Sequence, residues 1–155
     1  MAFEVSRQLQ RRGCAPGGLI LIDSPVPIQH EPLPADIISL IVGKSHTGAA
    51  GARSCIEAQF RRNARLLQSY APPPEPDGAL CIAIVCSQLM DTQNLCGRPY
   101  RWLSDGDSRE KSLKDWEQLL GRELPVLELN CNHFEVFSPV NVSNANPPSC
   151  SKYSL

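Results

Sequence analysis

The sequence predicts an α/β fold built on a parallel sheet of three strands. Three short apolar runs carry this prediction, and helical patterns separate each run from the next. A continuous apolar run between turn-forming residues is typical of a strand that is buried on both faces. Strands that alternate with helices form crossover connections, which place the strands parallel in one sheet. The predicted strands are residues 18–22, 79–86 and 125–130.

The N-terminal part of the chain is predicted to contain a helix, a strand and two further helices. In residues 1–12 the apolar side chains fall on one helical face, and Gly13 ends the pattern. The apolar run of residues 18–22 is the first strand. Prolines between residues 25 and 34 fix φ and lack an amide donor, so this stretch is expected to be extended. The next two helices are expected at residues 35–42 and 52–70.

The C-terminal part is predicted to contain a strand, a loop, a helix and a strand. The prolines of residues 71–78 end the preceding helix and form a stiff linker to the second strand. Residues 87–107 are expected to be a loop. Ser108 is expected to cap the helix of residues 108–120. Asparagine, proline and serine dominate the end of the chain, which predicts a disordered tail over residues 143–155.

Composition and charge are those of an ordinary soluble globular protein. Hydrophobic residues make up 42% of the chain and the net charge is −1, so nothing indicates binding to nucleic acid or to an acidic membrane surface. No segment approaches the ~18 consecutive apolar residues of a membrane span. The N-terminus also lacks the apolar stretch of a signal peptide. A cytoplasmic location is therefore expected.

The seven cysteines predict reduced thiols rather than disulfides or a metal site. Their number is odd, and no two have C-x-x-C spacing. No paired Cys/His spacing could assemble four zinc ligands, so no metal is expected. Cys86 and Cys131 fall in the predicted strand regions, where a free thiol behaves as a small hydrophobic side chain.

Two members of a nucleophile–histidine–acid triad can be read from the sequence. Asp23 directly follows the first strand, and His133 follows the third. In parallel α/β sheets the catalytic groups lie beyond the carboxyl ends of the strands, so these two residues should meet at one edge. There the carboxylate would orient the imidazole, which would act as general base. Asp91, beyond the second strand, is the alternative acid.

The nucleophile of such a triad is missing from these residues. A serine on a tight strand-to-helix turn would stand in the pattern G-x-S-x-G, which does not occur. The run Gly43-Lys44-Ser45 lacks the second glycine, and no buried strand precedes it. It does not match a phosphate-binding loop either, because the earlier glycine of that motif would fall at Ile38. The sequence thus predicts an acid and a base without their nucleophile.

Three motifs carry a family resemblance: AFEVSRQL at residues 2–9, LILIDSP at residues 19–25 and NHF at residues 132–134. In this order they resemble the thioesterase domains that end polyketide synthases, especially the fungal iterative ones. Thioesterases of fatty acid synthases and peptide synthetases are more distant relatives. The resemblance covers residues 1–142 and implies the C-terminal part of a thioesterase domain, with a partial α/β-hydrolase fold.

The resemblance assigns roles to particular residues. In that family the serine turn directly precedes the helix that corresponds to residues 1–12, so the serine would lie before Met1. The acid follows the first strand of this chain, which favours Asp23 over Asp91, and the NHF motif matches His133. Residues 25–78 correspond to a lid-like insertion, shorter than is common in the family. The lid residues implied to line the acyl chamber are Ile37, Ile38, Leu40 and Ile41.

Three functions follow as alternatives. The first is release of an acyl or polyketide chain, by hydrolysis or cyclisation, through a serine ester. The substrate would be carried on the phosphopantetheine of an acyl carrier protein or of the rest of a polyketide synthase, and no other cofactor is implied. The second is a catalytically inactive remnant or a fragment that depends on a partner, which the missing front half favours. The third is another α/β-hydrolase, such as an esterase.

Overall fold

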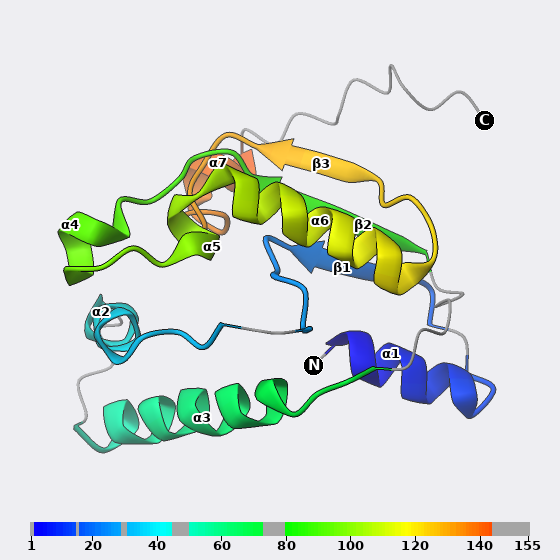
Figure 1. Cartoon of the computed structure of the whole chain (residues 1–155), viewed down its shortest axis with the longest axis horizontal. Helices are drawn as coiled ribbons and strands as arrows, with labels where there is room; N and C mark the ends of the chain where they lie inside the picture. The colour runs from blue at the N-terminus through cyan, green and yellow to red at the C-terminus, as the bar shows by residue number, and fades with distance from the viewer. Residues whose placement is uncertain (1, 15, 29–30, 45–49, 73–79, 144–155) are drawn as a thin grey trace.

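The computed structural model describes residues 2–14, 16–28, 31–44, 50–72 and 80–143, which form a sheet with helices around it (Figure 1). The strands are β1 (Leu19–Ile22), β2 (Cys81–Cys86) and β3 (Val126–Leu129). The helices are α1 (Ala2–Arg11), α2 (Ala35–Lys44), α3 (Ala50–Gln68), α4 (Thr92–Cys96), α5 (Arg101–Ser104), α6 (Gly106–Leu120) and α7 (Pro139–Ser143).

The predicted three-stranded parallel sheet is confirmed. The strands lie in the order β1-β2-β3, and both pairs are parallel. Ile22 at the end of β1 is opposite Ile84, and Cys86 at the end of β2 is opposite Leu129. The carboxyl ends of all three strands therefore lie at the same edge, and the residues that follow them are neighbours.

One face of the sheet is covered by α1 and α6 (Figure 1). Phe3 of α1 and Trp116 of α6 meet edge to face, with ring centroids 5.3 Å apart, a favoured geometry for aromatic pairs. The sheet contributes small and aliphatic side chains to the same core. The buried residues of this core are Phe3, Leu19, Leu21, Val26, Cys81, Ala83, Trp116, Leu119, Leu120 and Leu124.

The alternate side chains of the strands point to the opposite face. At the carboxyl end of this face Cys86 and Cys131 are buried together with Val136. Further along β1, the side chain of Ile20 is 61% exposed. This part of the sheet is therefore apolar but uncovered among the described residues.

The segment between β2 and α6 contains structure that the sequence analysis did not predict. Residues 87–107 were expected to be a loop, but they include the short helices α4 and α5. Asp91 caps α4, because its side chain accepts a hydrogen bond from the amide of Asn94 at 3.0 Å. These helices have five and four residues, too few to show an apolar period, so the loop prediction was wrong.

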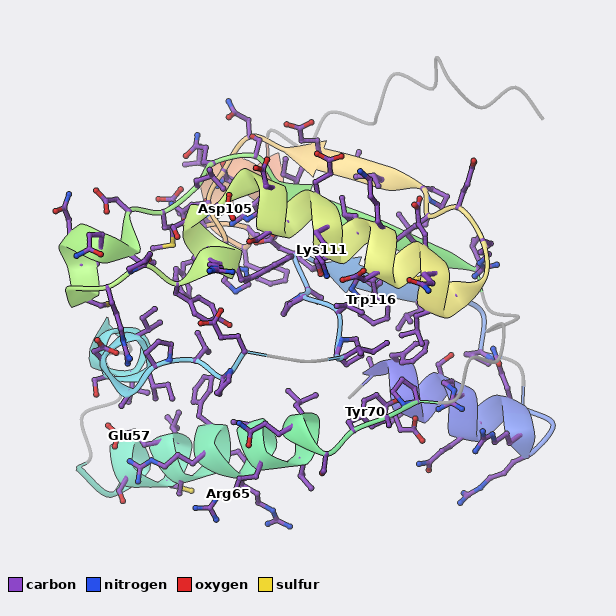
Figure 2. All side chains as sticks on the ribbon, viewed as in Figure 1. Glu57, Arg65, Tyr70, Asp105, Lys111 and Trp116 are labelled. Atoms are coloured by element: carbon purple, nitrogen blue, oxygen red, sulfur yellow. The ribbon has the colours of Figure 1, made fainter. Side chains whose placement is uncertain are left out.

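The start of α6 also differs from the prediction. The helix begins at Gly106, and its cap is Asp105, whose side chain accepts a hydrogen bond from the amide of Asp107 at 3.2 Å (Figure 2). Ser108, the predicted cap, lies inside the first turn, where its hydroxyl donates to Asp105 at 2.6 Å. Both side chains are suited to capping, and the earlier one takes that position.

The lid-like insertion predicted for residues 25–78 contains α2 and α3, while residues 29–30, 45–49 and 73–78 lie outside the described part of the chain. In α3 the apolar side chains alternate with exposed arginines such as Arg65 (Figure 2).

Of the predicted tail, residues 144–155 also lie outside the described residues. No helix in the described ranges has the length and apolar character to cross a membrane.

Candidate active site

Asp23 and His133 are 110 residues apart in the sequence and form a hydrogen bond, with Nδ1 of His133 2.8 Å from Oδ2 of Asp23. Asp23 directly follows β1, and His133 lies four residues after the end of β3. The parallel register places both segments at one edge of the sheet. The structure thus brings together the two residues that the sequence analysis paired.

The backbone of Asp23 turns sharply so that its side chain returns to the sheet edge. Its φ angle is +39°, in the left-handed region that aspartate tolerates better than most residues. Its amide donates to the carbonyl of Ile84 at 2.6 Å. Its Oδ1 accepts a hydrogen bond from the amide of Cys86 at 3.1 Å. The carboxylate is therefore fixed by the end of the neighbouring strand.

Asp23 is ionised although its side chain is only 1% exposed. Burial alone would raise its pKa, but hydrogen bonds from His133 and from the amide of Cys86, together with the charge of Arg109, outweigh burial and lower the pKa below its ordinary value. A carboxylate can only accept hydrogen bonds, so Nδ1 of His133 is the donor.

The second ring nitrogen of His133, Nε2, takes no part in the hydrogen bond to Asp23. With the proton on Nδ1, the neutral ring has its lone pair on Nε2, which can take a proton from a nucleophile. The side chain of His133 is 33% exposed, so a substrate or another polypeptide can reach it. The turn that holds it is fixed by Asn132, whose side chain accepts a hydrogen bond from the amide of Phe134 at 3.0 Å.

Asp91, the alternative acid, is the N-cap residue of α4 and not the partner of His133. It is exposed and caps α4, and the carboxylate that contacts His133 is that of Asp23. Strand-end position alone could not separate the two candidates, because both follow a strand. The hydrogen-bonding geometry separates them.

Arg109 is a site residue that the sequence analysis missed. Its side chain is 5% exposed, and its Nη2 lies 3.6 Å from Oδ2 of Asp23. Its Nε donates to the carbonyl of Trp102 at 2.9 Å, and its Nη1 donates to the carbonyl of Cys86. One signal was present in the sequence: Arg109 falls at helical spacing with the inward-facing Leu113 and Trp116 of α6.

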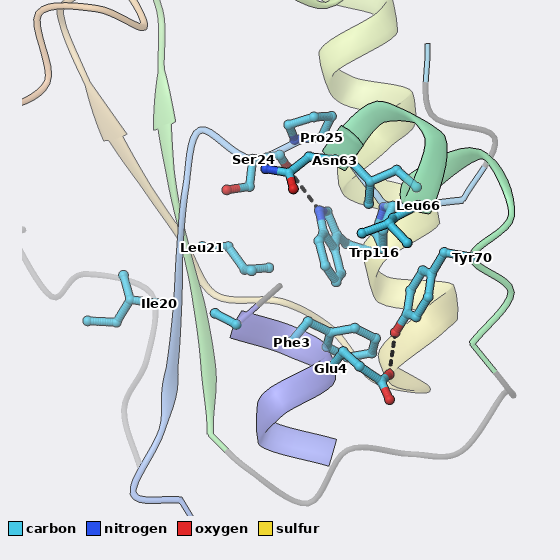
Figure 3. Close-up of a pocket in the computed structure, with 13 residues that line it drawn as sticks. Phe3, Glu4, Ile20, Leu21, Ser24, Pro25, Asn63, Leu66, Tyr70 and Trp116 are labelled. Atoms are coloured by element: carbon cyan, nitrogen blue, oxygen red, sulfur yellow. Dashed lines mark hydrogen bonds between the residues drawn. The ribbon is translucent and has the colours of Figure 1, made fainter. Parts of the chain in front are cut away.

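A cavity of about 430 Å³ lies among α1, β1, α3 and α6, beside the residues that follow Asp23 (Figure 3). Its walls are mostly apolar. Two hydrogen bonds hold them: the Tyr70 hydroxyl donates to Glu4 at 2.6 Å, and the Trp116 indole donates to the carbonyl of Ser24 at 2.9 Å. The residues that line it include Phe3, Glu4, Ile20 (whose side chain points away from it), Leu21, Ser24, Pro25, Asn63, Leu66, Leu67, Tyr70 and Trp116.

Among the described residues, the predicted lid residues Ile37 and Ile38 do not line this cavity. Ile37 is 1% exposed and packs in a cluster with Tyr100 and Leu103. Ile38 is also buried. The side chains of Leu40 and Ile41 lie outside the described part of the structure. Contact of these four residues with a substrate stays a prediction.

Neither cysteine near the site is suited to act as a nucleophile. Cys86 and Cys131 are buried, with their Sγ atoms 3.8 Å apart. Burial, reinforced by the nearby carboxylate of Asp23, raises the pKa of Cys86 to about 12, so its thiol stays protonated at neutral pH. In the described ranges no three histidine, cysteine or acidic side chains are grouped to hold a metal ion.

The chain is similar in sequence to fungal polyketide synthases, although no family model matches it. It is 29% identical over 191 residues to an orsellinic acid synthase of Beauveria bassiana, covering 100% of this chain and 9% of the relative. It is 29% identical over 143 residues to an orsellinic acid synthase of Armillaria mellea, and the match covers 89% of this chain and 6% of that relative. It is 25% identical over 166 residues to a non-reducing polyketide synthase of Cladonia grayi, covering 91% and 8%.

The fold is similar to that of solved thioesterases. The Vlm2 thioesterase domain, bound with a dodecadepsipeptide, has a TM-score of 0.61 and 14% identity, covering 92% of this chain and 57% of that one. Human thioesterase 2 has a TM-score of 0.54 and 15% identity, and the match covers 92% of this chain and 62% of that one. The chain thus spans under a tenth of its curated relatives and about three fifths of these solved chains.

The lowered pKa of Asp23 predicts how stability depends on pH. A carboxyl whose pKa is lower in the folded than in the unfolded chain stabilises the fold above the unfolded value, near 4. This contribution is lost as the pH falls through the lower, folded value. We expect the stability difference between the native chain and Asp23→Asn to shrink as the pH falls below about 4. Urea unfolding at a series of pH values measures it, and a constant difference would contradict the ionised state.

The two comparisons give one group of relatives by sequence and one group of neighbours by fold. The relatives found by sequence are fungal polyketide synthases, and the neighbours found by fold are thioesterases. The match to the Beauveria bassiana relative covers the whole chain, including Asp23 and His133. The chain thus has a fold similar to that of solved thioesterases and a sequence similar to part of fungal polyketide synthases.

Proposed function

We propose that the chain supplies the acid and the base of a thioesterase that releases an acyl or polyketide chain from a carrier-protein thioester. The observation that carries this proposal is the hydrogen bond between buried, ionised Asp23 and the partly exposed His133. Such an arrangement can activate a hydroxyl nucleophile, because the carboxylate orients the base. The similarity to polyketide synthases supports the thioester as the substrate class.

In the proposed reaction His133 moves protons and Asp23 orients it. Nε2 takes the proton of a serine hydroxyl while the oxygen attacks the thioester carbonyl. As the C–S bond breaks, the imidazolium gives that proton to the departing phosphopantetheine thiolate, which leaves as the thiol. Water, or a nucleophile within the acyl chain, resolves the ester with the same histidine as base. No other cofactor is needed.

The serine of this mechanism has to come from a further stretch of polypeptide. The pattern G-x-S-x-G does not occur in the 155 residues. About two fifths of each of these solved thioesterase chains lies outside the part that matches here. We therefore propose that the chain acts as part of a larger synthase, with the carrier protein as its partner.

The cavity of Figure 3 is proposed to hold the apolar part of the acyl chain. Its lining from Phe3, Leu66 and Trp116 suits a hydrophobic chain. Ser24 and Pro25, which directly follow Asp23, form part of its wall. A chain bound there would lie beside the segment that carries the acid.

The second candidate function is that of a non-catalytic fragment that depends on a partner. The missing serine motif favours it, and so does the exposed Ile20 on the uncovered face of β1. The two candidates differ in what a restored serine would do. A catalytic half-site would become active, and a remnant would stay inactive.

The isolated chain is expected not to react with a serine-directed fluorophosphonate probe. Such probes label only a serine that is activated by a base and an oxyanion hole, and the described site contains no such serine. Intact-mass spectrometry after incubation with the probe measures the labelling, with an active serine hydrolase as the positive control. Stoichiometric labelling, abolished by His133→Ala, would contradict the absence of an activated serine.

A hybrid synthase tests the catalytic roles directly. We expect the orsellinic acid synthase of Beauveria bassiana to release product when this chain replaces the segment it matches. In that hybrid, His133→Ala should abolish release, and Asp23→Asn should slow it by ~10⁴ because the histidine loses its orienting acid.

Asp91→Asn is the matched control, because asparagine caps a helix as well as aspartate. It should leave the release of orsellinic acid unchanged. Near-normal release by the His133→Ala hybrid would remove that residue from the mechanism. A hybrid that folds but stays inactive with both residues intact would favour the non-catalytic candidate.

The same hybrid tests the cavity. Leu66→Arg places a charged side chain in the apolar lining and should slow release by roughly tenfold, since a lost leucine contact costs about 1.5 kcal/mol or more. Leu89→Arg is the control, because Leu89 is similarly exposed but lies after β2, away from the cavity. Equal effects of the two variants on release would contradict the cavity as the acyl site.

A further inference from the structure

The guanidinium group of Arg109 contacts three segments that meet next to Asp23: α5, the end of β2 and the residue that follows β1. Nε donates to the carbonyl of Trp102 in α5 at 2.9 Å, and Nη1 donates to the carbonyl of Cys86 at the end of β2. Nη2 faces Asp23 across 3.6 Å. The planar, forked geometry of arginine allows these contacts to be made at once.

The position of Arg109 is costly unless the charge is compensated. Its side chain is 5% exposed, and that of Asp23 is 1% exposed. Nη2 is buried and has no hydrogen-bond partner among the described residues, so its compensation comes from the charge of Asp23. A buried cation without a counter-charge is strongly unfavourable. The charge of Arg109 therefore helps to lower the pKa of Asp23 and keep its carboxyl ionised.

Arg109 differs from the other groups that face the carboxylate. His133 contacts the same oxygen, Oδ2, but a histidine that acts as base is neutral before it takes a proton. Cys86 offers its amide to Oδ1, and its thiol stays protonated. The permanent positive charge beside Asp23 thus comes from Arg109, which is always protonated in proteins.

We infer that Arg109 is a positioning residue of the site, which holds the Asp23 carboxylate in place and ionised so that it fixes the Nδ1–H tautomer of His133. This inference rests on the proposed function. Arg109 acts through Asp23 and does not touch the reacting atoms. Its guanidinium replaces the water that would otherwise stabilise the carboxylate from behind.

The hydrogen bond that Arg109 is inferred to support can be observed in the chain as it exists. A proton held between Nδ1 and a carboxylate gives a downfield resonance in proton NMR and exchanges slowly with water. Loss of the resonance in His133→Gln would assign it, and loss in Asp23→Asn would identify its acceptor. Its exchange rate then reports how firmly the carboxylate is held.

Arg109→Met is the decisive variant, and Arg7→Met is its matched control. Arg7 is also 5% exposed and pairs with Glu4 at 2.8 Å, but it lies in α1 beside Phe3. Both variants remove a buried arginine and should lower the stability to urea. Only Arg109→Met should speed exchange of the His133 Nδ1 proton, by about tenfold or more, because a hydrogen bond to a charged group contributes roughly this factor.

The outcomes separate this inference from the proposed function. An unchanged exchange rate in folded Arg109→Met, or equal acceleration in Arg7→Met, would overturn the positioning role alone. No downfield resonance in the native chain would contradict the hydrogen bond itself, and with it both proposals. If Arg109→Met does not fold, Arg109→Lys is the variant that tests the inference. Lysine keeps the positive charge but lacks the forked guanidinium group, so exchange of the His133 Nδ1 proton should still be faster than in the native chain. An unchanged exchange rate would overturn the inference.

Discussion

A buried carboxylate needs compensation from several directions at once, and Asp23 obtains it from three parts of the chain. The imidazole of His133 and the amide of Cys86 donate hydrogen bonds, and Arg109 supplies positive charge. Each donor belongs to a different element: the turn after β3, the end of β2 and α6. The site can therefore form only when the sheet and α6 are assembled, and the hydrogen bonds of the site tie these elements to one another.

The parallel register explains why so much could be predicted from the sequence. Continuous apolar runs identify strands, and helices between them require parallel pairing. Parallel pairing then places every strand end at one edge, so Asp23 and His133 could be expected to meet although 110 residues separate them. Order along the chain is enough for this inference, because it needs no knowledge of side-chain packing. The family resemblance then favoured Asp23 over Asp91.

Features that depend on packing between distant segments could not be predicted in this way. The burial of Arg109 requires the carbonyls of Trp102 and Cys86 to converge on it, and neither leaves a sequence signal. The helices α4 and α5 are too short for periodicity and depend on local caps such as Asp91. The cavity is lined from four elements, so its residues could not be grouped by spacing, and the predicted lid residue Ile37 packs elsewhere.

The acid–base pair is held without any contribution from a nucleophile. Every contact described for Asp23 comes from within the segment between β1 and the turn of His133, and the charge that keeps it ionised comes from Arg109. A serine delivered to Nε2 would meet an imidazole whose tautomer is already set. Under the proposed function, a nucleophile would need a hydroxyl beside the exposed side of His133 and an oxyanion hole, but no change in the contacts of Asp23. The Asp23–His133 pair, the proposed acid and base, is thus held by contacts within the described residues.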